Sequence, residues 1–207
     1  MKLILVRHGQ TGYNATKIVQ GHLQNPLSEI GLEQAKMVGK RLKDEHYDVI
    51  LCSDLRRTKE TLEGIIKYHP HNEVIYDPLL RERSSGVFEG GPSAEREDAR
   101  LKAGLSKEDF RPEGGENDED FLLRIHTFIE NTYKSFPDKT ILVVTHWRWI
   151  MKFLVNLDPS LKEKLVKDED INNTSVNIVD FVEKGQHRII KINSTEHLED
   201  SFTDIAK

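Results

Sequence analysis

Apolar residues gather in short continuous runs that alternate with longer segments of helical periodicity. The runs at residues 2–6 and 140–145 contain no alternating polar positions, which is typical of central strands covered on both faces. Shorter apolar runs at 48–52 and 73–76 predict two further strands. Because helical segments separate these strands, the pattern predicts an α/β fold with a mostly parallel sheet.

Three long segments have the periodicity of an amphipathic helix. Apolar residues recur every three or four positions within 31–46, 55–66 and 116–136. Ser53 directly precedes the second segment and is predicted to be its N-cap. Each helix therefore has one apolar face that must pack against the sheet.

The C-terminal apolar runs complete the sheet, whereas a central segment does not follow the alternation of strands and helices. Residues 175–181 and 188–192 predict an antiparallel hairpin, which makes the sheet mixed. Between about 78 and 115 glycine and proline are frequent, although 93–102 predicts a charged helix. We interpret 78–115 as an excursion that partly covers a site. The sequence thus predicts one three-layer domain over 1–207, with helices on both faces of the sheet and an inserted lid-like excursion.

Composition narrows the class of protein. The chain of 207 residues is 37% hydrophobic and 31% charged, as expected for a globular protein with a real core. Its net charge of -5, without a long basic run, argues against a nucleic-acid partner but permits a small anionic substrate. No apolar run reaches membrane-spanning length, so no membrane partner is expected. A single cysteine, Cys52, which we expect to be buried, favours a cytoplasmic location. The oligomeric state is left open.

Two histidines directly follow the two central strands. His8 comes after the run at 2–6, and His146 after the run at 140–145. Because ligands of such sheets bind outside the carboxyl ends of the strands, the two side chains are expected to face one site. A neutral imidazole is a nucleophile toward phosphorus, and Arg7 beside His8 offers a forked donor for phosphate. Taken alone, however, a His-Gly pair more often marks an ordinary turn.

An arginine pair follows the strand at 48–52. Arg56 and Arg57 lie in the first turn of the predicted helix, where an anion is favoured. Only one of two adjacent helical residues points at a site, and the apolar pattern does not decide which. As an alternative, both belong to a solvated basic face.

A carboxylate lies among arginines at the start of the excursion. Glu82 stands between Arg81 and Arg83. If its pKa is raised in a closed site, such a carboxyl group can protonate the leaving oxygen of a phosphate ester. In isolation the same cluster also fits a set of exposed ion pairs.

Taken together, these motifs resemble the histidine phosphatase superfamily, also called phosphoglycerate-mutase-like. The segments that match, in family order, are RHGQT with Asn14, PLS with Gly31, SDLRRTKET, LRERSSGVFEG, PEGGE and VVTH. They extend from residue 3 to about residue 181. Since each motif is weak alone and the ordered set is specific, the resemblance outweighs the ordinary interpretations given above.

The resemblance implies a role for each matching position. His8 would be the phosphorylated nucleophile, with the phosphoryl oxygens held by Arg7, Arg57 and His146. Glu82 would protonate the leaving alcohol and later activate water. No metal or other cofactor is implied, and no histidine pair has the spacing of a metal site. The further residues expected to bind substrate or phosphate are Thr11, Asn14, Gln20, Gly21, Arg83 and Trp147.

The segment after Glu82 favours the phosphatase branch of the family. Mutases typically continue with Tyr-Gly and Gln-Gly, whereas this chain reads RSSGVFEG over 83–90. That segment is similar to fructose-2,6-bisphosphatase-type and broad-specificity phosphatases. We therefore expect a metal-independent phosphatase acting on small phosphate monoesters, sugar phosphates included, through a phosphohistidine. Phosphoglycerate mutase is the alternative within the enzyme class.

One stretch departs from the family pattern. After His146 the family usually has glycine, but this chain has Trp147 and Arg148. The indole either points away from the site or narrows the pocket while Arg148 adds an anion contact. In a third interpretation it blocks the phosphate site, which would leave a catalytically impaired protein that binds phosphorylated ligands or a partner.

Overall fold

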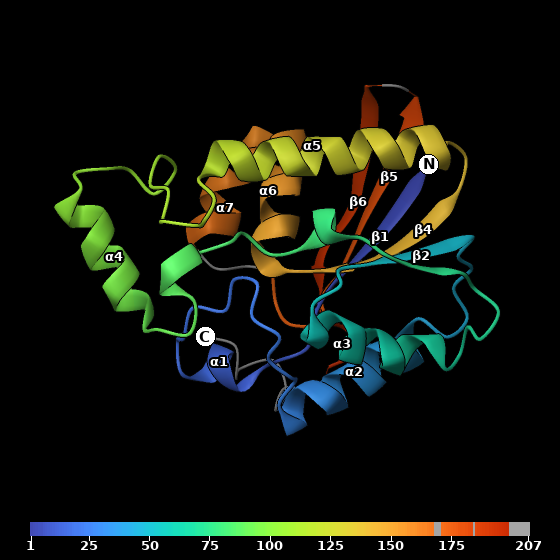
Figure 1. The fold of residues 1–207 in the computed structure, drawn as a ribbon. Coiled ribbons are helices and arrows are strands. Elements are labelled where there is room, and N and C mark those ends of the chain that lie inside the picture. Colours follow the sequence, from blue (N-terminus) through green and yellow to red (C-terminus); the bar gives the residue numbers. More distant parts are fainter. Residues whose placement is uncertain (168–170, 184, 199–207) are drawn as a thin grey trace.

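The computed structural model describes residues 1–167, 171–183 and 185–198. Its centre is a six-stranded sheet with the order β3-β2-β4-β1-β5-β6 (Figure 1). The strands β1 to β4 are parallel to one another, whereas β5 is antiparallel to both β1 and β6, which confirms the predicted mixed sheet. The strands are β1 (Lys2–Arg7), β2 (Val49–Cys52), β3 (Val74–Tyr76), β4 (Thr140–Thr145), β5 (Val176–Glu183) and β6 (Gln186–Ser194).

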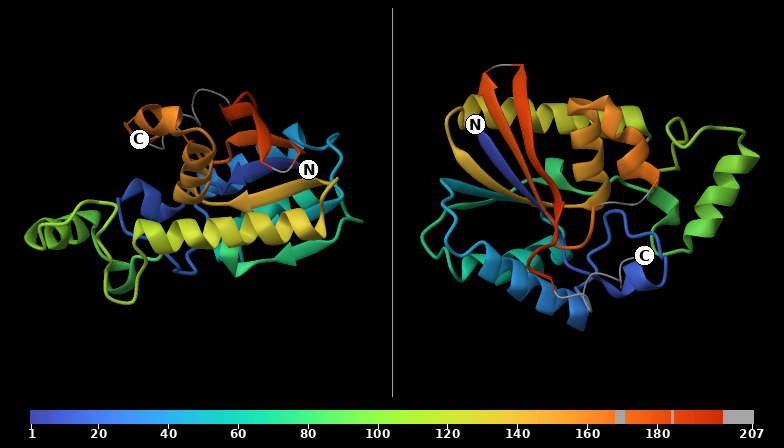
Figure 2. Two further views of the ribbon diagram at one scale, coloured as in Figure 1. Left: turned by 90° about the horizontal axis from the view of Figure 1, so that it is seen from above. Right: turned by 180° about the vertical axis from the view of Figure 1, so that it is seen from behind.

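Helices cover both faces of this sheet, as predicted. The helices α2 (Glu29–Arg41) and α3 (Arg56–Ile66) lie on one face, while α5 (Asp118–Ser135) and α6 (Trp147–Leu157) lie on the other (Figures 1 and 2). A short helix, α7 (Lys162–Lys167), packs beside α6. In the described part of the chain, no helix is both long and apolar enough to cross a membrane.

Each central strand sends its side chains alternately into two separate cores. In β1, Leu3 and Leu5 pack in the core under α5 and α6, whereas Ile4 and Val6 pack in the core under α2 and α3. All four side chains are at most 1% exposed. This burial on both faces is why the run at 2–6 has no polar alternation.

Residues 78–115 begin at the core under α5 and α6, where Leu80 is buried, and then leave the helical layers. They contain the short 3-10 turns η1 (Pro78–Leu80) and η2 (Gly86–Phe88) and the helix α4 (Ser93–Lys102), which stands to one side of the sheet (Figure 1). Backbone hydrogen bonds join this segment to the loop after α1 (Gly12–Ala15): Val19 N–H donates to Gly91 O at 3.0 Å, and Ser93 N–H donates to Lys17 O at 3.1 Å. The segment therefore packs beside the loop that follows β1.

Two predicted helix ends were wrong. The helix predicted over 31–46 is α2, which ends at Arg41 because Leu42 is the last residue of its buried stripe and the chain then turns into β2. Ser53 is not the N-cap of α3; Leu55 holds that position without a side-chain hydrogen bond. The Ser53 hydroxyl is directed to His146 instead.

Candidate active site

The pairing of β1 with β4 brings the two histidines together. Arg7 is opposite Thr145 in this parallel pair, and His8 N–H donates to Thr145 O at 3.0 Å. As a result His8 and His146 both leave the carboxyl edge of the sheet, with ring centroids 5.2 Å apart. The two side chains are buried.

The hydrogen bonding of His8 fixes its tautomer. Its Nδ1 lies 2.7 Å from Gly9 O, and since a carbonyl oxygen only accepts, Nδ1 carries the proton. Burial, followed by the charges of Arg57 and Arg7, holds the pKa of His8 well below the ordinary 6.5. The imidazole is therefore neutral at physiological pH, with the lone pair of Nε2 free to act as a nucleophile.

A loop from the far end of the chain supports the backbone of His8. Asn173 Nδ2 donates to His8 O at 2.8 Å, and Thr174 N–H donates to Arg7 O at 3.0 Å. The guanidinium of Arg7 donates to Ile171 O at 2.6 Å. Sequence reasoning missed Asn173, because its contact depends on how the loop before β5 crosses the end of β1.

Arg57, rather than Arg56, points into the site. Its side chain is fully buried and donates to Leu23 O and Gly21 O, each at 2.9 Å. Burial lowers the pKa of Arg57 to about 10, so the guanidinium stays charged at neutral pH. Arg56 is exposed and pairs with Glu60 at 2.7 Å.

Gly21 requires a residue without a side chain. Its φ is +45°, and an added Cβ would lie 2.0 Å from Oε1 of Glu89. Since the Gly21 carbonyl accepts from Arg57, this tight loop fixes the orientation of the guanidinium.

The loop after His8 supplies neutral polar groups. Asn14 Oδ1 accepts from Thr11 N–H at 3.0 Å, which leaves the Asn14 amide nitrogen as a donor for a ligand. The Thr11 hydroxyl donates to Gln20 Oε1 at 3.1 Å, and Thr11 itself is fully buried. Asn14 and Gln20 line the cavity beside His8, whereas Thr11 lies behind them as a support.

His146 is also held in a defined orientation. Its Nε2 lies 2.8 Å from the Ser53 hydroxyl, while its Nδ1 is buried with no hydrogen-bond partner among the described residues. Burial is the main reason that the pKa of His146 lies well below 6.5, and the charge of Arg57 adds to it. A buried ring nitrogen without a partner is a group that a bound anion can satisfy.

Glu82 is positioned by two backbone donors. Its Oε1 accepts from Arg83 N–H at 2.8 Å, and its Oε2 accepts from Arg148 N–H at 3.2 Å, in the first turn of α6. The carboxyl group lines the same cavity as His8. The start of α6 therefore fixes the carboxylate, although the sequence there lacks the glycine that the resemblance led us to expect.

Arg124 of α5 holds the segment that carries Glu82. Its Nη1 donates to Leu79 O and Arg81 O, each at 2.8 Å, and its Nη2 donates to Glu82 O at 3.1 Å. Its Nε and Nη2 also donate to the two Glu116 carboxylate oxygens, each at 2.8 Å. Sequence reasoning missed Arg124, because a helical arginine gives no local sign of such distant acceptors.

Of two further predicted ligand contacts, Trp147 lines the cavity and Arg83 does not. Arg83 is only 5% exposed and pairs with Asp118 at 2.5 Å, away from the cavity wall. Trp147 lines the cavity as the first residue of α6 and has no positive φ. About 350 Å³ of the cavity remains open beside it, so the indole narrows the site without filling it.

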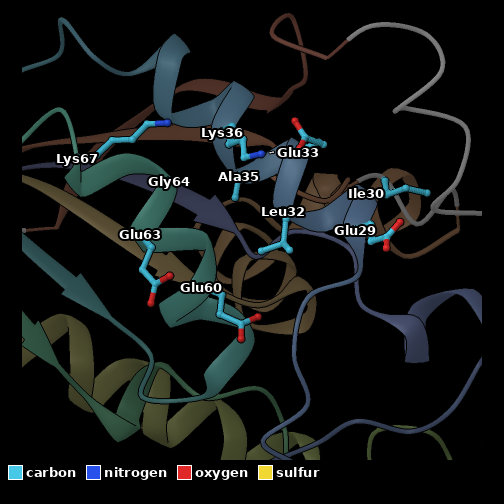
Figure 3. Close-up of a pocket in the computed structure, with 10 residues that line it drawn as sticks. All are labelled: Glu29, Ile30, Leu32, Glu33, Ala35, Lys36, Glu60, Glu63, Gly64 and Lys67. Carbon is cyan, nitrogen blue, oxygen red and sulfur yellow. Dashed lines mark hydrogen bonds and ion pairs between the residues drawn. The ribbon is translucent and has the colours of Figure 1, made fainter.

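A second hollow, of about 630 Å³, lies between α2 and α3 (Figure 3). Its walls mix glutamates with lysines, and Glu33 pairs with Lys36 at 2.6 Å. It contains none of the candidate residues. Elsewhere in the described ranges, no group of three or more His, Cys, Asp or Glu is arranged to hold a metal ion.

The chain is similar to known phosphatases over almost its whole length. The family model described as "Histidine phosphatase superfamily (branch 1)" matches residues 3–195. A broad-specificity phosphatase of Saccharomyces cerevisiae is 32% identical over 97% of this chain and 88% of its own length. Fructose-2,6-bisphosphatase TIGAR B of Danio rerio is 40% identical over 66% of this chain, which corresponds to only 55% of that protein.

A solved structure agrees with these sequence matches. Bacillus stearothermophilus YhfR superimposes with a TM-score of 0.85 at 26% identity, and the match covers 96% of this chain and 99% of that one. The α/β arrangement described above is therefore a fold that is already known.

Proposed function

The chain belongs to branch 1 of the histidine phosphatase superfamily, and we propose that it hydrolyses small phosphate monoesters through a phosphohistidine on His8. The observation that carries the proposal is the His8 imidazole. Its Nδ1 is bonded to Gly9 O, and its Nε2 is available in a cavity that Arg7 and Arg57 also line. A neutral, oriented imidazole beside two cations is suited to attack on a phosphoryl group.

In the first step, Nε2 of His8 attacks phosphorus and forms an N–P bond. The bond from phosphorus to the alcohol oxygen breaks, and its electron pair stays on that oxygen. Glu82, in its protonated form, gives the alcohol oxygen a proton, so a neutral alcohol leaves. The two backbone donors on Glu82 keep its carboxyl group in a fixed position for this transfer.

In the second step, water attacks phosphorus while the Glu82 carboxylate accepts a proton from it. The N–P bond breaks, and its electron pair returns to Nε2 of His8. Inorganic phosphate leaves, and both side chains are restored to their starting protonation states. The same carboxyl group thus acts first as an acid and then as a base.

The charges of the site support the transferring group without a metal in this mechanism. Arg7 and Arg57 offer guanidinium donors that match phosphoryl oxygens. The unpartnered Nδ1 of His146 offers a further hydrogen bond if the Ser53 hydroxyl donates to Nε2. Asn14 adds a neutral donor from its amide nitrogen. Because the protein holds these groups in place before reaction, little reorganisation accompanies the transition state.

Small phosphorylated metabolites, sugar phosphates included, are the substrate class that we propose. The names of the similar phosphatases from yeast and zebrafish support it. Phosphoglycerate mutase, the alternative, would pass the phosphoryl group to a second hydroxyl instead of water. We also propose a cytoplasmic location, supported by Cys52, a buried free thiol.

The proposal is tested by phosphate release from para-nitrophenyl phosphate in the presence of EDTA. We expect wild type and His71→Ala, a variant of an exposed loop histidine, to release phosphate at similar rates. We expect His8→Ala to lose at least about a thousandfold in rate. An acid-labile, alkali-stable phosphate should be trapped on wild type and His71→Ala but not on His8→Ala. His8→Ala activity near the wild-type rate would rule out the mechanism.

A further inference from the structure

The cavity carries more positive charge than one phosphoryl group requires. The cationic side chains that line it are Arg7, Lys17, Arg57, Arg96 and Arg148. Among the described lining residues, Glu82 is the single carboxylate. A phosphate monoester brings close to two negative charges at neutral pH, which Arg7 and Arg57 balance. The remaining cations have no such role in the proposed mechanism.

Lys17 is exposed, and the other four cations belong to two groups that share Glu82 as a charged neighbour. The charges that act on Arg57 are those of Glu82, Glu89 and Arg7. Those acting on Arg148 belong to Arg83, Arg96, Glu82 and Asp118. Glu82 is the group that both sets share. Glu82 Oε2 accepts from the backbone N–H of Arg148 at 3.2 Å, and Arg96 and Arg148 line the same cavity as Glu82. We treat Arg96 and Arg148 as a second group of cations beside the phosphoryl-binding arginines.

The Arg148 side chain stacks on Trp147 but forms no ion pair among the described residues. Its guanidinium lies over the Trp147 ring, 5.4 Å from the centroid. Across the described residues it has no hydrogen-bond acceptor and no ion-pair partner. Burial and the repulsion of Arg83 and Arg96 lower the pKa of Arg148 to about 10. Gathering like charges in this way is unfavourable for the free protein, and a bound anion would offset that cost.

Arg96 completes the second group from the excursion. Its Nη1 donates to Ser85 Oγ at 3.2 Å, and within the described ranges no carboxylate pairs with it. Arg83 differs, because it forms an ion pair with Asp118, which also pairs with Lys152. The cations left to bind a ligand here are thus Arg96 and Arg148, from α4 and α6 respectively.

We propose that Arg96 and Arg148 form a second anion subsite, which selects phosphate monoesters whose alcohol part carries a further anionic group. The inference rests on the proposed function, since it places the leaving oxygen at Glu82. Because the transferred phosphoryl group is bound at His8 in the proposed mechanism, the further anion belongs to the departing alcohol. At the positions where the family usually has glycine, this chain has Trp147 and Arg148, and the indole of Trp147 supports the guanidinium of Arg148.

The test compares three-carbon alkyl phosphates that end in a second phosphate, a carboxylate or a neutral hydroxyl group. For wild type we expect kcat/KM to be at least about tenfold higher for one of the anionic substrates than for the neutral one, after halving the bisphosphate value for its two equivalent ends. In Arg148→Gln and in Arg96→Gln, this ratio should fall roughly tenfold. Arg111→Gln, a variant of an exposed arginine paired with Asp120, should keep the wild-type ratio.

The outcomes separate this inference from the proposed function. Hydrolysis of all three substrates with a ratio near one would overturn the subsite and leave the phosphatase proposal standing. A high ratio that neither variant reduces would also overturn it, because recognition would then lie elsewhere. If the protein hydrolyses neither these three substrates nor para-nitrophenyl phosphate, the proposed function itself is overturned. Comparison of kcat/KM between the bisphosphate and the carboxylate substrate shows which anion the subsite prefers.

Discussion

Ser53 and His146 leave the ends of neighbouring strands, and the Ser53 hydroxyl lies 2.8 Å from His146 Nε2. A hydroxyl either donates to or accepts from an imidazole nitrogen. When it donates, the proton of the neutral ring is on Nδ1, the buried nitrogen that lacks a partner. Ser53 thereby determines whether His146 can donate a hydrogen bond to a phosphoryl oxygen.

Removing the Ser53 hydroxyl should therefore impair catalysis more than folding. We expect Ser53→Ala to lower kcat/KM roughly tenfold, equivalent to about 1.4 kcal/mol. The melting temperature should fall by only a few degrees, because one hydrogen bond is lost in a small site. Ser106→Ala, at an exposed position, serves as the control for both measurements. Unchanged kcat/KM would show that His146 does not depend on this contact.

The role of Glu82 is tested with two leaving groups. Glu82→Gln keeps the shape of the side chain but has no proton to give as an acid. Alkyl phosphates, whose alcohols need that proton, should lose at least about a hundredfold in kcat. Aryl phosphates, with more acidic leaving groups, should lose far less in the phosphorylation step. Equal losses on both, measured in single-turnover experiments, would contradict the assignment of Glu82 as the acid.

The sequence was sufficient to predict the arrangement of strands that places His8, the proposed nucleophile. The unbroken apolar runs that became β1 and β4 identified the central strands, and their ends placed His8 beside His146. This worked because burial on both faces leaves a clear local signal. Likewise, the charged helix predicted over 93–102 is α4, with the same bounds.

The supporting contacts were not predictable, because they join residues distant in sequence. Asn173 contacts His8 across 165 positions, and Arg124 contacts Leu79 across 45. The choice between Arg56 and Arg57 also depended on tertiary contacts, since the loop at 21–25 supplies the acceptors. Hydrophobic periodicity reports which face is buried, and it carries no information about which polar groups meet there.

Arg124 should act as a positioning residue for Glu82. Arg124→Lys keeps the charge but cannot reproduce the fork that reaches both Glu116 and the carbonyls of residues 79–82. We expect kcat for alkyl phosphates to fall roughly tenfold while the value for aryl phosphates falls less. A purely structural role would lower both alike, so the alkyl-to-aryl ratio decides the matter. Arg111→Lys, at an exposed ion pair, is the matched control.

Two buried histidines and one half-buried histidine should make the protein less stable in mild acid. Burial is the leading cause that lowers the pKa of His8, His146 and His197, the last to about 4. The unfolded chain, with ordinary values near 6.5, therefore binds more protons than the folded one as the pH falls below 6.5. The stability contributed by the neutral rings is fully present above pH 6.5. As the pH falls below 6.5, this contribution to the free energy of unfolding decreases by up to about 1.4 kcal/mol per pH unit for each ring.

Urea unfolding between pH 7.5 and 5 measures this loss, and His197 offers the cleanest variant. Its Nε2 lies 3.2 Å from Thr174 Oγ1, and it does not line the catalytic cavity. His197→Gln removes one of the three rings whose pKa is lowered. We expect it to reduce the slope of unfolding free energy against pH by up to about 1.4 kcal/mol per unit between pH 6.5 and 5. An identical slope in wild type and variant would mean that His197 is protonated equally in the folded and unfolded chains.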